Sequence, residues 1–180
     1  MQEQHRKTVT LVLGGVRSGK SRLALTLASR FARVVFIATA KATDDEMERK
    51  IERHRAERPA HWRTIEEPLA LDAAMRASAT DADVAVVDCL TIHAAHLLEL
   101  GAGAEAAIER LVAALRQPLV HVILVSNEVG SGVVPEYPIG RRYRDLLGEM
   151  NQAVAAVADN VALMVAGLPL VLKGRLEEQP

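Results

Sequence analysis

The sequence of 180 residues lacks most of the features that mark specialised classes of protein. It contains a single cysteine, Cys89, which excludes an internal disulfide and is compatible with a reducing compartment. The formal net charge is only −1, so the overall electrostatics give no reason to expect nucleic acid or an anionic membrane as a partner. The longest apolar run, residues 161–172, is interrupted by Gly167 and Pro169 and is too short to cross a bilayer.

A signal peptide is not expected either, because residues 1–7 are polar and no cleavage site follows the next apolar stretch. We therefore expect a cytoplasmic protein. The length suits one well-buried domain over residues 1–180 and is too short for two. Residues 1–7 and 173–180 are polar or charged and are predicted to be flexible tails.

What the chain does contain is a complete phosphate-binding motif. The run from Gly14 to Ser21 matches the pattern G-x-x-x-x-G-K-[ST], follows an apolar segment and opens a helical pattern. Glycines let backbone N–H groups turn toward a polyphosphate, Lys20 can reach its β and γ oxygens, and Ser21 can hold Mg²⁺. The alternative is a chance glycine turn with a surface lysine. The full motif in this context predicts a nucleoside triphosphate as ligand.

Short apolar, β-branched runs alternate with helical patterns along the rest of the chain. Continuous apolar strands separated by helices indicate a parallel sheet covered on both faces. We therefore predict an α/β protein of the P-loop type, with a doubly wound, mainly parallel sheet and helices on both faces. The predicted strands are 9–13, 34–38, 84–88, 120–125 and 161–165, the predicted helices are 20–32, 44–57, 69–78, 92–100, 104–116 and 140–158, and residues 62–66 are either a strand or an extended connection.

Asp88 closes the third predicted strand, directly after four apolar residues. Ligands of open parallel sheets bind at the carboxyl ends of the strands, so Asp88 is expected beside the phosphate-binding loop, where its carboxylate can join the Mg²⁺ shell. The alternative is that Asp88 caps the following helix.

The predicted helix 44–57 carries a histidine on its one protein-facing stripe. Met47, Ile51, His54 and Arg58 recur at helical spacing, while the other positions are charged. His54 is therefore expected to point inward, among arginines. From position alone, a packed or helix-terminal histidine remains the alternative to a functional one.

Residues 126–138 follow a predicted strand and contain two glycines and two prolines. A long loop at the carboxyl edge of a sheet commonly carries substrate. Arg141, Arg142 and Arg144 follow in a first helical turn, where the dipole disfavours bases; they are either an exposed basic patch or a phosphate clamp. No N-K-x-D segment is present, so a signalling GTPase is not expected.

These pieces together resemble the bifunctional adenosylcobinamide kinase / adenosylcobinamide-phosphate guanylyltransferase family of cobalamin biosynthesis. The resemblance runs from the first strand to about Leu172, and the ordered set is far more selective than a phosphate-binding loop alone. Its most specific segments are 14–22 (GGVRSGKSR), 37–40 (IATA), 44–47 (DDEM), His54 followed by 58–64 (RPAHWRT), and 127–136 (NEVGSGVVPE).

The resemblance implies a kinase that phosphorylates the aminopropanol hydroxyl of adenosylcobinamide with ATP or GTP, then transfers GMP to that phosphate and releases pyrophosphate. The guanylylated histidine of the family corresponds to His54, and Lys20 is the catalytic residue of the loop. A homotrimer and Mg²⁺ as cofactor, held by Ser21 and Asp88, are also implied. The family's nucleotide-binding positions correspond to Gly14, Gly15, Val16, Arg17, Ser18, Gly19, Lys20, Ser21, Ala38, Thr39, Ala40, Arg55, Ala56, Glu57, Arg58, Glu66 and Asp88.

The chemistry of these residues agrees with that assignment. Neutral imidazole, the major form near pH 7, is a nucleophile that needs no dedicated base, so His54 can attack an α-phosphorus. Glu66 could accept hydrogen bonds from guanine and replace the missing GTPase motif. Two other functions remain open: a plain P-loop kinase of a small molecule without a covalent intermediate, and a nucleotide-dependent switch or assembly ATPase.

Overall fold

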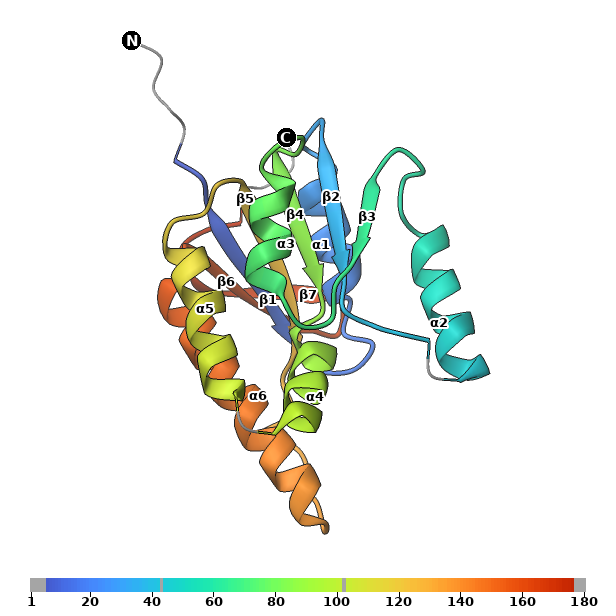
Figure 1. The fold of residues 1–180 in the computed structure, drawn as a ribbon, viewed down its shortest axis with the longest axis vertical. Helices are drawn as coiled ribbons and strands as arrows, with labels where there is room; N and C mark the ends of the chain where they lie inside the picture. Colours follow the sequence, from blue (N-terminus) through green and yellow to red (C-terminus); the bar gives the residue numbers. More distant parts are fainter. Residues whose placement is uncertain (1–5, 43, 102, 177–180) are drawn as a thin grey trace.

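The computed structural model describes residues 6–42, 44–101 and 103–176 (Figure 1). Its centre is a seven-stranded sheet with the order β3-β2-β4-β5-β1-β6-β7, in which β1 to β6 run parallel and β7 runs antiparallel to β6. This confirms the predicted mainly parallel α/β sheet. The strands are β1 (Val9–Gly14), β2 (Val34–Ala38), β3 (Arg63–Glu66), β4 (Val84–Asp88), β5 (His121–Asn127), β6 (Asn160–Val165) and β7 (Leu168–Lys173).

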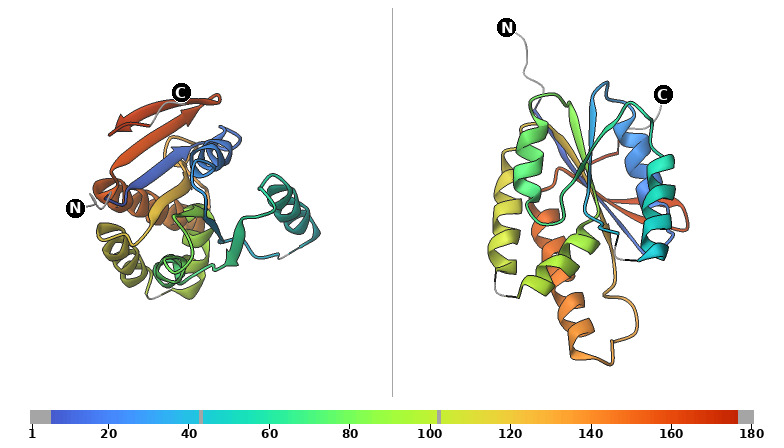
Figure 2. Two further views of the ribbon diagram at one scale, coloured as in Figure 1. Left: turned by 90° about the horizontal axis from the view of Figure 1, so that it is seen from above. Right: turned by 45° about the vertical axis from the view of Figure 1, so that its right-hand side comes forward.

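The helices divide unequally between the two faces of the sheet, as Figure 2 shows. One face packs against α3, α4, α5 and α6, and the other packs mainly against α1. The α1 face also buries Trp62, which is 7% exposed and packs in the same cluster as Phe36. The helices are α1 (Lys20–Ala28), α2 (Asp45–Ala56), α3 (Leu71–Ser78), α4 (Leu90–Leu100), α5 (Ala104–Arg116) and α6 (Pro138–Val157).

Helix α2 stands apart from this layered core. It lies beyond the β3 edge of the sheet in Figure 1 and in the left view of Figure 2, and within the described residues it has no extensive packing against another helix or strand. Asp44 caps its N-terminus by accepting a hydrogen bond from the Met47 amide at 2.8 Å. The cap stabilises the helix itself, but the helix has little packing against the layered core.

The C-terminal end of the sheet differs from the prediction. The turn Ala166–Gly167 reverses the chain and β7 follows as an edge strand, whereas residues 173–180 were expected to form a tail that begins at Lys173. Lys173 is instead the last residue of β7, and its ammonium donates to the carbonyl oxygens of Ala155 and Ala156 at 3.1 and 3.0 Å. Of the predicted tails 1–7 and 173–180, residues 1–5 and 177–180 lie outside the described residues.

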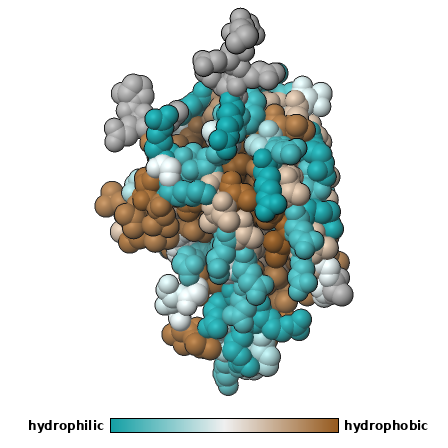
Figure 3. Space-filling model, turned by 90° about the vertical axis from the view of Figure 1, so that its left-hand side faces the viewer, coloured by the Kyte–Doolittle hydropathy of each residue, from teal (hydrophilic) through white to brown (hydrophobic). Residues whose placement is uncertain are grey.

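The β6–β7 hairpin leaves apolar side chains in contact with solvent. Figure 3 shows them as a projecting hydrophobic patch at the left of that view. No helix in the described part of the chain is long and apolar enough to cross a membrane. The exposed hydrophobic residues of the hairpin are Val165, Leu168, Leu170, Val171 and Leu172.

Candidate active site

The loop after β1 has the geometry that phosphate binding requires. Gly14 has φ 154°, and a Cβ there would lie 2.5 Å from Ser18 Oγ and 2.6 Å from the carbonyl oxygen of Met164, so only glycine fits. Gly19, with φ 97°, is the N-cap of α1, which places the helix N-terminus directly behind the loop. The sequence motif therefore folds as predicted, as a strand, a tight loop and a helix.

Lys20 lies inside this loop and is only 8% exposed. Its ammonium donates to the carbonyl oxygen of Gly15 at 2.6 Å. Burial lowers the pKa of Lys20 below its usual value, against the opposing effects of Cys89 and Asp88. A polyphosphate in the loop would supply the negative charge that this buried ammonium lacks.

Three strand ends form one row beside the loop. Ala38 at the end of β2 pairs with Glu66 at the end of β3 and with Asp88 at the end of β4. This register brings together three positions that lie more than 20 residues apart along the chain. Asp88 lies where the sequence placed it. Its alternative role as a helix cap is wrong, because Cys89 is the N-cap of α4.

The surroundings of Asp88 suit a cation. Burial raises the pKa of Asp88 above its usual range, and it outweighs the Ser21 hydroxyl, which donates to the carboxylate, and the charges of His54, Arg58 and Lys20. Mg²⁺ prefers hard oxygen ligands and commonly takes only one or two from the protein, keeping several waters. The adjacent hydroxyl and carboxylate fit such an ion. The described residues contain no cluster of three or more His, Cys, Asp or Glu that would suit a fully protein-ligated metal.

Helix α2 turns its half-buried stripe toward this row. Met47, Ile51, His54 and Arg58 are half-buried and line the same cleft as the phosphate-binding loop. The predicted inward orientation of His54 is confirmed. His61, the nearest other histidine along the chain, is exposed and lies outside the cleft lining.

Arg58 fastens the C-terminal end of α2 to the sheet. Its guanidinium lies 3.7 Å from the centroid of the Phe36 ring, donates through Nε to the His54 carbonyl at 3.0 Å, and donates through Nη1 to Thr64 Oγ1 at 3.3 Å. Burial lowers the pKa of Arg58 below its usual value. The sequence placed Arg58 near a nucleotide but gave no sign of this anchoring role, because both Phe36 and Thr64 lie on other elements.

The cleft that these elements enclose has a volume of about 1370 Å³. Some predicted nucleotide contacts do not line it: Gly14, Gly15, Thr39 and Ala56. Thr39 is fully buried, and its hydroxyl joins β2 to β4 by donating to the Cys89 carbonyl and accepting from the Cys89 amide, both at 2.8 Å. The predicted positions that do line the cleft are Val16, Arg17, Ser18, Gly19, Lys20, Ser21, Ala38, Ala40, His54, Arg55, Glu57, Arg58, Glu66 and Asp88.

The loop after β5 leads away from the cleft. Asn127 lines the cleft, but residues 128–137 and the start of α6 form an arm at the lower end of Figure 1. Arg141 Nη1 donates to the carbonyl oxygens of Pro135 and Glu136 at 3.0 and 2.5 Å, so this arginine holds the arm together. Arg142 and Arg144 also lie outside the cleft lining. The structure does not bring these arginines to the phosphate-binding loop.

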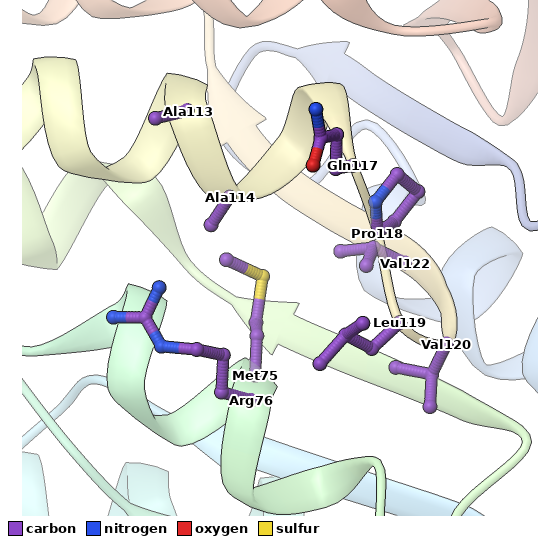
Figure 4. A pocket seen from close by; sticks show the side chains of 9 residues that line it. All are labelled: Met75, Arg76, Ala113, Ala114, Gln117, Pro118, Leu119, Val120 and Val122. Atoms are coloured by element: carbon purple, nitrogen blue, oxygen red, sulfur yellow. The ribbon is translucent and has the colours of Figure 1, made fainter.

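A second cavity of about 270 Å³ lies between α3 and α5, beside the amino end of β5 and at the opposite end of the sheet (Figure 4). Met75 projects between the two helices toward Ala114, and the wall is mostly apolar. Arg76 stands at its side and pairs with Asp72 one turn earlier. Lys20, His54, Glu66 and Asp88 all line the larger cleft instead.

Comparison with known proteins decides the family. Residues 10–172 match the family model described as cobinamide kinase / cobinamide phosphate guanyltransferase. The chain belongs to this family. The fold class, the bifunctional enzyme activity and the place in cobalamin biosynthesis that the sequence suggested are thereby confirmed.

Relatives of this cobinamide kinase / guanylyltransferase family cover nearly the whole chain. The bifunctional adenosylcobalamin biosynthesis protein CobP of Pseudomonas aeruginosa is 49% identical over 91% of this chain and 96% of its own length. The bifunctional proteins named CobU from Escherichia coli and Salmonella typhimurium are 39% and 40% identical, each over 91% of this chain and 98% of their own length.

Solved structures of low identity share the fold of this family member. An ATPase of a bacterial type III secretion system has a TM-score of 0.56 at 13% identity, over 88% of this chain and 51% of that larger chain. A protein of Pyrococcus horikoshii has a TM-score of 0.57 at 11% identity, over 96% and 89% of the two chains. At these identities the likeness concerns the fold alone.

Proposed function

We propose that the large cleft beside the phosphate-binding loop carries both reactions of the family. Adenosylcobinamide is phosphorylated on its hydroxyl by ATP or GTP, and the product then receives GMP from GTP with release of pyrophosphate. The observation that supports a shared site is that the phosphate-binding Lys20, the acid Asp88 and the nucleophile candidate His54 line one cleft. Both Lys20 and His54 act on the pKa of Asp88, so all three groups lie within electrostatic reach of one another.

The phosphoryl transfer depends on positioning and charge. The substrate hydroxyl oxygen bonds to the γ-phosphorus while the bond to the β–γ bridging oxygen breaks, and the hydroxyl proton leaves to water. Lys20 holds the β and γ oxygens, and the loop amides and the start of α1 orient them. Ser21 and Asp88 would hold Mg²⁺, which supplies charge neutralisation on the transferring group when bound.

The guanylyl transfer proceeds in two displacements. A ring nitrogen of His54 bonds to the α-phosphorus of GTP as pyrophosphate leaves, and a phosphate oxygen of cobinamide phosphate then displaces the imidazole. The products are adenosylcobinamide-GDP and free His54. Arg55 and Arg58 stabilise negative charge on the transferred and leaving groups. Glu66, at the strand-end row, accepts hydrogen bonds from the N1–H and N2–H₂ of guanine, which adenine cannot offer in the same arrangement.

Labelled GTP tests this function. Protein incubated with α-labelled GTP should retain label as an acid-labile, alkali-stable phosphoramidate, and γ-labelled GTP should leave none. A kinase without a covalent intermediate would show ADP formation but neither covalent label nor pyrophosphate. A switch or assembly ATPase would hydrolyse nucleotide without any corrinoid acceptor.

We also propose that the protein works as a homotrimer, joined in part through the β6–β7 hairpin. Five apolar residues of this hairpin are exposed, and a solvent-exposed apolar edge strand commonly marks a contact surface. Light scattering should give three times the 19.5 kDa chain mass, and Leu170→Glu should lower it. A monomer in the wild-type protein would refute the proposal.

A cytoplasmic location is proposed on the chemistry of the reaction, because the enzyme consumes nucleoside triphosphates. The single cysteine is compatible with a reducing compartment. Fractionation of cells that produce the protein at its natural level tests this location, and recovery from an extracytoplasmic fraction would contradict it.

A further inference from the structure

We propose that the β6–β7 turn and Arg22 form a second nucleoside-binding site, which holds the purine of the nucleotide that donates its γ-phosphate. This second site lies across the phosphate-binding loop from the first site, where guanine binds during GMP transfer. The inference rests on the proposed two-step function and specifies where each nucleotide binds. The two reactions then use one triphosphate cradle with the nucleotide lying in opposite directions.

The order of the strands requires the two directions. The phosphate-binding loop follows β1, and β5 and β4 lie on one side of β1 while β6 and β7 lie on the other. In the kinase reaction the γ-phosphate must lie near Ser21 and Asp88, on the β4 side, so the nucleoside extends toward β6. In GMP transfer the α-phosphorus must reach His54, and the pyrophosphate lies on the loop. The nucleoside then extends toward α2 and β3.

The β6–β7 turn is built against the loop on the side where the kinase nucleoside would lie. The Gly167 amide donates to the Ser18 carbonyl at 3.1 Å, and Ala166 and Gly167 line the same cleft as Lys20. Both turn residues have positive φ values, 51° and 84°, which fold the hairpin tightly at this point. The methyl group of Ala166 and the absence of a side chain at Gly167 leave room for a flat ring beside the loop.

Arg22 supplies a surface on which a purine can stack. Its Nη2 lies 3.4 Å from the position that a Cβ on Gly167 would occupy and 3.6 Å from the equivalent position on Gly19, so the guanidinium extends across the turn. Arg22 also lines the cleft, and no hydrogen bond or ion pair of its side chain is found among the described residues. A planar guanidinium free of protein partners stacks well on an aromatic ring.

The two nucleoside-binding sites differ in how they can recognise a base. Every acidic residue of the cleft lining comes from α2, its C-cap, β3 or β4: Glu48, Glu52, Glu57, Glu66 and Asp88. The β6–β7 side of the cleft offers a guanidinium and small side chains. Stacking accepts either purine, whereas a carboxylate selects the N–H groups of guanine. The kinase reaction should therefore accept ATP and GTP, while GMP transfer should require guanine.

A crossed pair of variants tests the proposal on the full-length protein. Arg22→Ala should raise the KM for ATP in the kinase reaction about 5- to 20-fold, while the KM for GTP in GMP transfer to supplied cobinamide phosphate changes by less than about 2-fold. Glu66→Gln should show the opposite pattern, with a raised KM for GTP in GMP transfer and a nearly unchanged KM for ATP in the kinase reaction. Arg110→Ala, which removes an exposed arginine from α5, is the control for loss of a surface charge. Circular dichroism checks that each variant is folded.

Photolabelling gives an independent readout. With 8-azidoadenosine triphosphate, the peptide that contains residues 165–168 should be labelled, and Arg22→Ala should reduce that label. Label confined to residues 55–66 would overturn the proposed second site. So would an Arg22→Ala variant in which both KM values rise equally or neither changes. A wild-type protein that catalyses neither reaction would instead refute the proposed function, so the two failures are distinguishable.

Discussion

The phosphate-binding loop and helix α2 face each other across the cleft, but they are held in very different ways. The loop is enclosed by β1, α1 and the β6–β7 turn, with Gly14 and Lys20 buried and bonded within it. Helix α2 stands beyond the sheet edge, and the contacts of Arg58 with Thr64 and the Phe36 ring tie its C-terminal end to the sheet. The triphosphate cradle is thus rigid, while the nucleophile lies on a loosely packed element.

This difference indicates a division of labour between the two reactions. Phosphoryl transfer gains most from fixed positioning of charge, which a preorganised loop provides. GMP transfer requires His54 to reach an α-phosphorus and then admit a second substrate, which a weakly packed helix can accommodate at small cost. Each of the following variants probes one side of this contrast.

The largest effect is expected for His54→Ala. GMP transfer and covalent labelling from α-labelled GTP should fall by about 10⁴-fold or more, because the nucleophile itself is lost. Phosphorylation of adenosylcobinamide should stay within about 3-fold of wild type, since Lys20, Ser21 and Asp88 remain. Separate assays of the two reactions measure this. His61→Ala is the matched control. If the label were lost in His61→Ala and kept in His54→Ala, His54 would not be the nucleophile.

Lys20→Ala should depress both reactions by about 10²- to 10³-fold, because both place phosphate groups in the same loop. The fold should persist, since removing a buried ammonium also removes its desolvation cost. Circular dichroism and the two activity assays decide the outcome. A folded variant that keeps either reaction near the wild-type rate would contradict a shared cradle.

Asp88→Asn should weaken Mg²⁺ dependence and lower kinase turnover by about 10- to 100-fold, because the amide keeps the shape but not the charge. Burial raises the pKa of Asp88 in the folded protein, so the folded state binds more protons than the unfolded state, and stability falls as pH rises through that raised pKa. Without nucleotide or Mg²⁺, the variant should therefore melt higher than wild type at pH 8, and the difference should shrink near pH 4. If the dependence of activity on Mg²⁺ concentration were the same in the variant as in wild type, Asp88 would not be a ligand of the metal.

The smallest effect is expected for Arg58→Lys, which keeps the charge but loses the forked contacts to His54 and Thr64. GMP transfer should fall about 10-fold and the kinase reaction by less than about 3-fold, because α2 loses its anchor while the loop is untouched. Steady-state kinetics of both reactions measure the split. Equal losses would show that Arg58 binds a nucleotide common to both steps rather than positioning α2.

Local patterns predicted most of the layered core. Apolar β-branched runs such as Val84–Asp88 became buried parallel strands, and the spacing of His54 gave its inward orientation. The sequence pattern does not predict the edge strand β7, because Gly167 and Pro169 interrupt the apolar run. In the structure Gly167 forms the turn, and Pro169 is tolerated on an edge strand that lacks a second neighbour.

Contacts between distant segments were beyond the reach of sequence patterns. The register that aligns Glu66, Ala38 and Asp88 and the contact of Arg58 with Phe36 depend on strand order, which local spacing does not encode. Helix α6 begins at Pro138 rather than at Gly140, although proline at the first helical position was a readable signal. Asp88 was predictable from its place at the end of an apolar run, whereas the predicted contacts at Ala38 and Glu66 came only from the family resemblance.

The buried side chain of Trp62 gives this molecule an intrinsic optical probe. It is the only tryptophan of the chain, it lies in the connection between α2 and β3, and its amide donates to the Pro59 carbonyl at 3.0 Å. Because its indole packs in the cluster that contains Phe36, on which Arg58 rests, any swing of α2 is transmitted to the surroundings of one fluorophore. Stopped-flow emission of the unmodified protein can therefore time the helix during each half of the reaction cycle, without an added dye or an engineered label.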